Sequence, residues 1–164
     1  MSPSATSRPT DATAPRTAVQ KAAMAVGVVF LAVGVLGFVP GITQDVDTMS
    51  AAGHESEAML LGIFQVSILH NIVHLLFGVA GLALARHAAT ARSYLLGGGV
   101  VYLLLWVYGL LIDKESEANF VPVNPADDWL HLVLGLGMIA LGVLLSRRLT
   151  DDRVATRRTG VDHR

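Results

Sequence analysis

The chain has 164 residues, of which 52% are hydrophobic and only 15% are charged, and its formal net charge is −1. A mean hydropathy of +0.54 and 16 glycines are wrong for a small soluble domain and indicate a membrane protein. This composition offers no strongly basic surface, so nucleic acid is excluded as a partner. The chain has no cysteine, which excludes disulfides, thiolate metal sites and cysteine nucleophiles.

Four stretches lack Asp, Glu, Lys and Arg over a length close to that of a membrane span. A helix needs roughly 20 apolar residues, or a few fewer, to cross the hydrocarbon core. The sequence therefore predicts an all-α integral membrane four-helix bundle. The predicted transmembrane domain covers residues 22–148, with spans at about 22–39, 58–85, 93–112 and 129–146.

The second stretch is longer than a crossing needs. Its 28 uncharged residues would form a helix of about 42 Å. We therefore expect the useful crossing to run from near Asn71 to about Ala89, and residues 58–69 to form an interfacial or partly re-entrant segment. A single, steeply tilted helix is the alternative. The corresponding segment of the second half, Val121 to Pro125, contains two prolines and is predicted to be a loop.

Charges predict the orientation, because basic residues are retained on the cytoplasmic side. Eleven of the twelve basic residues precede the first span, separate the second from the third, or follow the fourth. The opposite loops carry nine acids against Lys114, a charge of −8, whereas the basic side carries eleven bases against four acids, or +7. Both termini are therefore predicted to be cytoplasmic, in the plasma membrane.

The two ends of the chain differ from the spans in composition. Residues 1–21 are rich in Ser, Thr, Ala and Pro and are predicted to be a disordered cytoplasmic N-terminus. Residues 149–164 are predicted to be a cytoplasmic basic tail. This tail either stays solvated or lies along the acidic lipids of the inner leaflet.

The chain contains an internal repeat. Shifting Val66 to Leu84 by 57 residues places it without a gap on Val123 to Leu141. The shift pairs His74 with His131, Gly78 with Gly135 and Asn71 with Asp128. The first span matches the third at an offset of 72, so each half is predicted to be a helical hairpin and the bundle to consist of two similar hairpins.

Polar residues gather at the outer ends of the second and fourth spans. Residues three or four apart share a helix face, as His70 and His74 do, and as Asp127 and His131 do. Four functions for these groups remain open: hydrogen bonding between helices, a divalent transition metal, a proton relay or pH sensor, and haem held between His74 and His131. The candidate metal ligands are His70, His74, His131, Asp127 and Asp128, and the candidate pocket also includes Asn71 and Tyr108.

Small residues near the histidines predict close helix packing. Such residues let the backbones of membrane helices approach. The candidates are Gly78, Gly81, Gly135 and Gly137. The pattern His70-Asn71-x-x-His74 has Asn71 where a zinc protease has its catalytic Glu, which argues against peptide hydrolysis.

The segment Leu61-Gly-Ile-Phe-Gln-Val66, followed by His70-Asn-Ile-Val-His-Leu-Leu-Phe-Gly78 and later by Asp128-x-x-His131-x-x-x-Gly135, resembles the actinobacterial membrane proteins of domain-of-unknown-function family 4383. The resemblance covers roughly Ala22 to Arg148 and implies a small multi-span plasma-membrane protein. It carries no established activity. Members of the family often have Asn-Pro where this chain has Ser67-Ile68.

These observations predict a non-enzymatic membrane component that binds or senses a molecule at an outward-facing polar pocket, or acts as an accessory protein. The alternative is a redox or transport protein that binds a transition metal or haem through His70, His74 and His131. The expected partners are the lipid bilayer and either further copies of the chain or a larger membrane complex.

Overall fold

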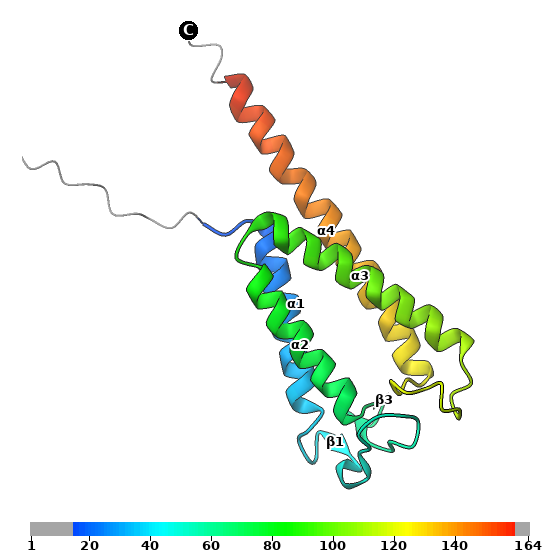
Figure 1. The fold of residues 1–164 in the computed structure, drawn as a ribbon. Coiled ribbons are helices and arrows are strands. Elements are labelled where there is room, and N and C mark those ends of the chain that lie inside the picture. Colours follow the sequence, from blue (N-terminus) through cyan, green and yellow to red (C-terminus); the bar gives the residue numbers. More distant parts are fainter. Residues whose placement is uncertain (1–14, 160–164) are drawn as a thin grey trace, which may run out of the picture.

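The computed structural model describes the backbone of residues 15–159 and the side chains of residues 15–146. Within this part the chain is mostly helical, as predicted (Figure 1). The helices are α1 (Ala18–Leu36), α2 (Ile68–Leu84), α3 (Ala88–Leu111) and α4 (Pro125–Thr159). Between α1 and α2 lie β1 (Thr43–Gln44), the short 3-10 helix η1 (Val46–Thr48), β2 (Met59–Leu60) and β3 (Phe64–Gln65).

The predictions for the two chain ends fall largely outside the described residues, which leave out residues 1–14 and 160–164 and the side chains after Ser146. One difference is visible, because α1 begins at Ala18, inside the stretch predicted to be disordered. Thr17 and Gln20 form a capping box that starts the helix. Gln20 Nε2 also donates to the carbonyl oxygen of Ala85 at 3.0 Å, which ties the start of α1 to the end of α2.

The four described helices form two pairs. α1 lies beside α2, and α3 beside α4, with α3 crossing near the ends of α1 and α2 that lie opposite the sheet (Figure 1). Glycines permit close approach within each pair: a Cβ on Gly27 would lie 3.0 Å from the carbonyl oxygen of Gly78, and one on Gly99 would lie 2.8 Å from that of Gly135. Each pair is therefore a tight antiparallel hairpin.

The apolar stretch 58–85 is divided between two structures. Its first part forms an antiparallel hairpin in which Leu60 pairs with Phe64, in place of the single long tilted helix. The hairpin turns at Leu61 and Gly62, whose φ angles are 55° and 70°. α2 then starts after Ser67 and has 17 residues, a length of about 25 Å.

Within the described residues, three helices are long and apolar enough to cross a bilayer: α1, α3 and the part of α4 from Pro125 to Ser146. α2 is apolar but shorter. Large apolar side chains are exposed along all four helices, among them Val28, Leu76, Leu104 and Val133. Apolar surface of this extent fits contact with lipid, and the chain is accordingly a membrane protein.

The core consists of two clusters. The larger lies between the helix pairs and includes Phe30 of α1, Tyr102 of α3 and Met138 of α4. The rings of Phe30 and Tyr102 stack with their centroids 5.3 Å apart. The smaller cluster, Ala58, Leu60 and Val66, lies in the segment that carries the sheet. This segment covers the ends of α1 and α2, and the candidate site lies beneath it.

Candidate functional site

Four polar side chains from two helices line one cavity of about 100 Å³ beneath the sheet. α2 contributes His70 and His74, and α4 contributes Asp127 and His131. No more than 8% of any of these residues is exposed. His70 and Asp127 are 57 residues apart, as are His74 and His131, so matched positions of the two similar segments meet here. We call this space the histidine cavity.

The hydrogen bonds of His70 and His74 determine their protonation pattern. His70 Nδ1 lies 3.2 Å from the carbonyl oxygen of Pro122, and His74 Nδ1 lies 3.0 Å from that of His70. A carbonyl oxygen only accepts, so each Nδ1 carries the hydrogen and, in the neutral ring, Nε2 is a hydrogen-bond acceptor. Within the described residues neither Nε2 atom has a hydrogen-bond partner. The cavity therefore contains two free acceptors.

The third imidazole, His131, forms no hydrogen bond within the described part of the chain, and its Nδ1 is buried. Its ring centroid lies 6.5 Å from that of His70 and 5.3 Å from that of Tyr102. A neutral imidazole has one N–H, so this group lacks an acceptor. Leaving a buried polar group unpaired costs about 1–3 kcal/mol. An unpaired group in a cavity lined by other polar groups points to a ligand or an ordered water.

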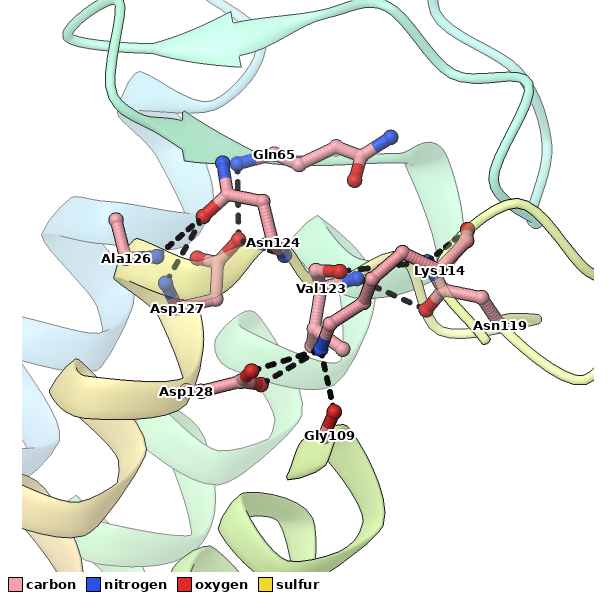
Figure 2. Close-up of polar contacts among 9 residues, drawn as sticks. All are labelled: Gln65, Gly109, Lys114, Asn119, Val123, Asn124, Ala126, Asp127 and Asp128. Atoms are coloured by element: carbon pink, nitrogen blue, oxygen red, sulfur yellow. Dashed lines mark hydrogen bonds and ion pairs between the residues drawn. The ribbon is translucent and has the colours of Figure 1, made fainter. Parts of the chain in front are cut away.

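Asp127 joins the sheet to the start of α4 (Figure 2). Its Oδ2 accepts hydrogen bonds from the backbone N–H of Gln65 at 3.1 Å and from that of Asn124 at 2.9 Å. Only 2% of Asp127 is exposed. These two bonds orient the carboxylate and hold β3 against α4, so Asp127 both shapes the cavity and adds a further acceptor to it.

Equivalent caps place His70 and Asp127 in their helices. The hydroxyl of Ser67 accepts from the backbone N–H of His70 at 3.1 Å, and Oδ1 of Asn124 accepts from that of Asp127 at 3.0 Å. In both cases the cap is three residues before the side chain that lines the cavity. Ser67 thus caps α2 as Asn124 caps α4, with a hydroxyl oxygen at one position and an amide oxygen at the other.

Asp128 was also among the predicted metal ligands, but its carboxylate lies against Lys114 and not in the histidine cavity. Its Oδ2 lies 2.8 Å from Nζ of Lys114, which also donates to the carbonyl oxygen of Gly109 at 2.7 Å (Figure 2). Lys114 therefore binds the end of α3 to the start of α4. Asp128 serves this ion pair and does not line the histidine cavity.

Asn71 and Tyr108 also lie outside the histidine cavity. Nδ2 of Asn71 is 3.7 Å from the sulfur of Met49, and its Oδ1 is buried without a partner among the described residues. The hydroxyl of Tyr108 donates to the carbonyl oxygen of Ala118 in the loop before α4. These two side chains fix the loops before α2 and α4 against the helix ends.

Three of the four predicted packing glycines lie at close contacts. Gly78 and Gly135 are described above, and a Cβ on Gly81 would lie 2.7 Å from the hydroxyl of Tyr94. A Cβ on Gly137 would meet nothing within 4 Å among the described atoms, so Gly137 makes no close helix contact within the described part of the chain.

The described residues contain no group of three or more His, Cys, Asp or Glu side chains that could hold a metal ion. The rings of His70 and His74 are stacked, with centroids 4.7 Å apart and planes at 15°. Their lone pairs therefore lie in nearly parallel planes, whereas tetrahedral coordination needs lone pairs that converge.

Lys114 and Gln65 were not among the predicted site residues, although both hold the start of α4 in place. The sequence does single out Lys114, because it is the one Lys or Arg among nine acids on the predicted outer side and is therefore a candidate ion-pair partner for one of them. Nothing in the sequence points to Gln65, because it donates to Asp127 through its backbone N–H. A backbone donor carries no information about residue type.

Apolar helices with buried polar side chains define the class as a helical membrane protein. The family model described as Domain of unknown function (DUF4383) matches residues 20–144, and the chain belongs to this family. The resemblance seen in the sequence is thereby confirmed. No curated protein and no solved structure matches the chain.

Proposed function

We propose that this chain is a four-span plasma-membrane protein, built from two similar hairpins, that binds a small molecule without transforming it. The ligand occupies the histidine cavity. The observation that carries the proposal is the pair of backbone hydrogen bonds that leave Nε2 of His70 and of His74 as acceptors without a partner among the described residues, in two side chains that line the cavity and are at most 8% exposed. Such acceptors are favourable only when a donor meets them.

Matched contacts support the duplication. Gly37 packs on the side chain of Asn71, where a Cβ would lie 2.1 Å from Oδ1, and Gly109 packs in the same way on Asp128. The helices α2 and α4 begin 57 residues apart, at the offset of the sequence repeat. The stacked rings of Phe30 and Tyr102, from α1 and α3, are related by the offset of 72 and lie where a pseudo-two-fold axis would pass.

The charge distribution supports the orientation, with the sheet and the loop before α4 outside and both termini inside. The domain boundaries follow from it: an N-terminal cytoplasmic segment up to about residue 21, a membrane domain over residues 22–148, and a basic cytoplasmic tail. In this orientation the histidine cavity lies near the outer surface. α2 then crosses with 17 helical residues, which is at the short end of the range for a span.

The groups that line the cavity favour binding over covalent catalysis. They comprise three imidazoles, one carboxylate and apolar side chains, with no hydroxyl, thiol or amine among the described lining. The carboxylate already accepts two backbone hydrogen bonds. The alternative function, a metal or haem protein, has one observation in its favour, since an Nδ1–H bound to a carbonyl is also how metal-binding imidazoles are oriented.

The test is to identify what the protein retains on purification from its own membranes. Organic and aqueous extracts of the wild type should contain one small molecule in a fixed ratio to protein. Replacing His131 by Leu should reduce it about tenfold, the effect of losing one hydrogen bond, while the exposed His87→Leu should not. Extracts that are the same in both variants would contradict the proposal. Stoichiometric metal or a Soret band, lost in His74→Leu, would establish the alternative.

A further inference from the structure

The rim of the histidine cavity differs in chemistry from its floor. The buried part of the lining includes the three imidazoles and Asp127. Every lining residue that is exposed or half-exposed is apolar: Val33, Leu61, Phe64, Leu130 and Leu134. A water-soluble ligand would have to pass apolar side chains to reach polar groups. The rim therefore favours entry by a molecule that is itself dissolved in apolar surroundings.

The position of the rim indicates which surroundings these are. Val33 belongs to α1, and Leu130 and Leu134 belong to α4, two of the helices long enough to cross a bilayer. Val33 lies one turn from the end of α1, and Leu134 lies about 14 Å from the start of α4. In a four-span arrangement the rim thus faces the outer leaflet of the bilayer, between one helix of each half.

The floor defines what the ligand must present. His70 and His74 each offer an acceptor, and the neutral ring of His131 has an N–H without an acceptor among the described residues. A hydroxyl group both donates and accepts, so it satisfies both kinds of site. An ammonium group only donates and would leave the N–H of His131 unpaired, and its charge would be costly to bring through an apolar rim.

We propose that the ligand of the histidine cavity is a hydroxyl-bearing amphiphile that enters sideways from the outer leaflet, between α1 and α4, with its tail remaining in the lipid. This inference rests on the proposed binding function and specifies its ligand. A space of about 100 Å³ accommodates a head group and not a whole lipid. The tail leaves over Leu130 of α4, which is 36% exposed.

The test compares two probes that differ in one hydrogen-bond donor: 4-decylphenol and 4-decylanisole, its methyl ether. Binding of each probe to the full chain in lipid nanodiscs is measured by isothermal titration calorimetry. The phenol should bind about tenfold more tightly than the ether, because the ether cannot donate to Nε2 of His70 or His74. Equal affinities would overturn the inference.

The route of entry has its own matched pair of variants. Leu130→Trp should block the rim and weaken phenol binding at least about tenfold, whereas Leu104→Trp, on the exposed surface of α3, should have no effect. Unchanged binding in Leu130→Trp would refute entry between α1 and α4. If neither probe binds but the purified protein retains a water-soluble molecule that His131→Leu releases, the proposed function stands and this inference fails.

Discussion

Two glycines on one helix allow the packing of α4 to be measured directly. Gly135 and Gly137 are both in the membrane part of α4, two residues apart, and only Gly135 is in close contact. A Cβ on Gly135 would lie 2.8 Å from Cδ2 of Leu103 and 3.0 Å from the carbonyl oxygen of Gly99. Leu103 can rotate away, but a backbone oxygen cannot, so α3 and α4 must separate slightly.

The free energies follow from these contacts. Overpacking of this kind costs about 1–3 kcal/mol. Alanine also favours a helix over glycine by roughly 0.5–1 kcal/mol, but this gain is common to both positions and cancels in the comparison. The free energy of unfolding of Gly135→Ala should therefore be lower than that of Gly137→Ala by about 1–3 kcal/mol.

The assay is denaturant unfolding of both variants in the same detergent micelles, followed by helical circular dichroism. Gly99→Ala is a second check, because its Cβ would lie 2.8 Å from the carbonyl oxygen of Gly135 across the same contact. It should behave like Gly135→Ala. Equal unfolding free energies for Gly135→Ala and Gly137→Ala, or a larger loss in Gly137→Ala, would refute the described packing of α3 on α4.

Three further predictions concern the end of the helices beside the sheet and the proposed orientation of the chain. Lys114→Met should lower the free energy of unfolding by about 2 kcal/mol, because it leaves Asp128 unpaired, and Lys114→Met combined with Asp128→Leu should restore most of it; additive losses in the unfolding assay would contradict the ion pair. Asn71→Asp should lower the free energy of unfolding by about 3 kcal/mol, because it buries a carboxylate that has no Lys or Arg partner among the described residues. An unchanged thermal unfolding temperature would argue against that burial. The chain has no cysteine, so Asp47→Cys should react with an impermeant maleimide in intact cells and His87→Cys only after permeabilisation; the opposite pattern would reverse the proposed orientation.

Helical spacing made part of the site predictable. Residues four apart lie on one face, so His70 with His74, and Asp127 with His131, could be paired from the sequence before their positions were known. The same geometry explains why Asp127 and Asp128 could not both line the cavity. Neighbouring residues on a helix point about 100° apart, and Asp128 accordingly faces Lys114. The sequence predicted the candidates, but not which of two adjacent acids would be used.

Other features had no sequence signal. The strands β2 and β3 have two residues each, too few for an alternating pattern to be recognised. The tautomer of His70 is fixed by the hydrogen bond that its Nδ1–H donates to the carbonyl oxygen of Pro122, 52 residues away, and a backbone acceptor is independent of residue type. The helical content and membrane character could thus be predicted from composition, whereas the orientation of the imidazoles depends on long-range backbone contacts.

If the chain arose by the proposed duplication, divergence between the two halves explains how two similar hairpins form an asymmetric site. Under the proposed duplication, His70 corresponds to Asp127, and Asn71 corresponds to Asp128. The acid at position 128 has a base within reach, since Lys114 lies 2.8 Å away, whereas Asn71 contacts Met49 and Gly37 and remains uncharged. Two copies of the second half would have brought two carboxylates into one buried space, and like charges are costly there. Because the position that corresponds to Asp127 is His70, the cavity contains one carboxylate, which two backbone N–H groups hold, beside three imidazoles.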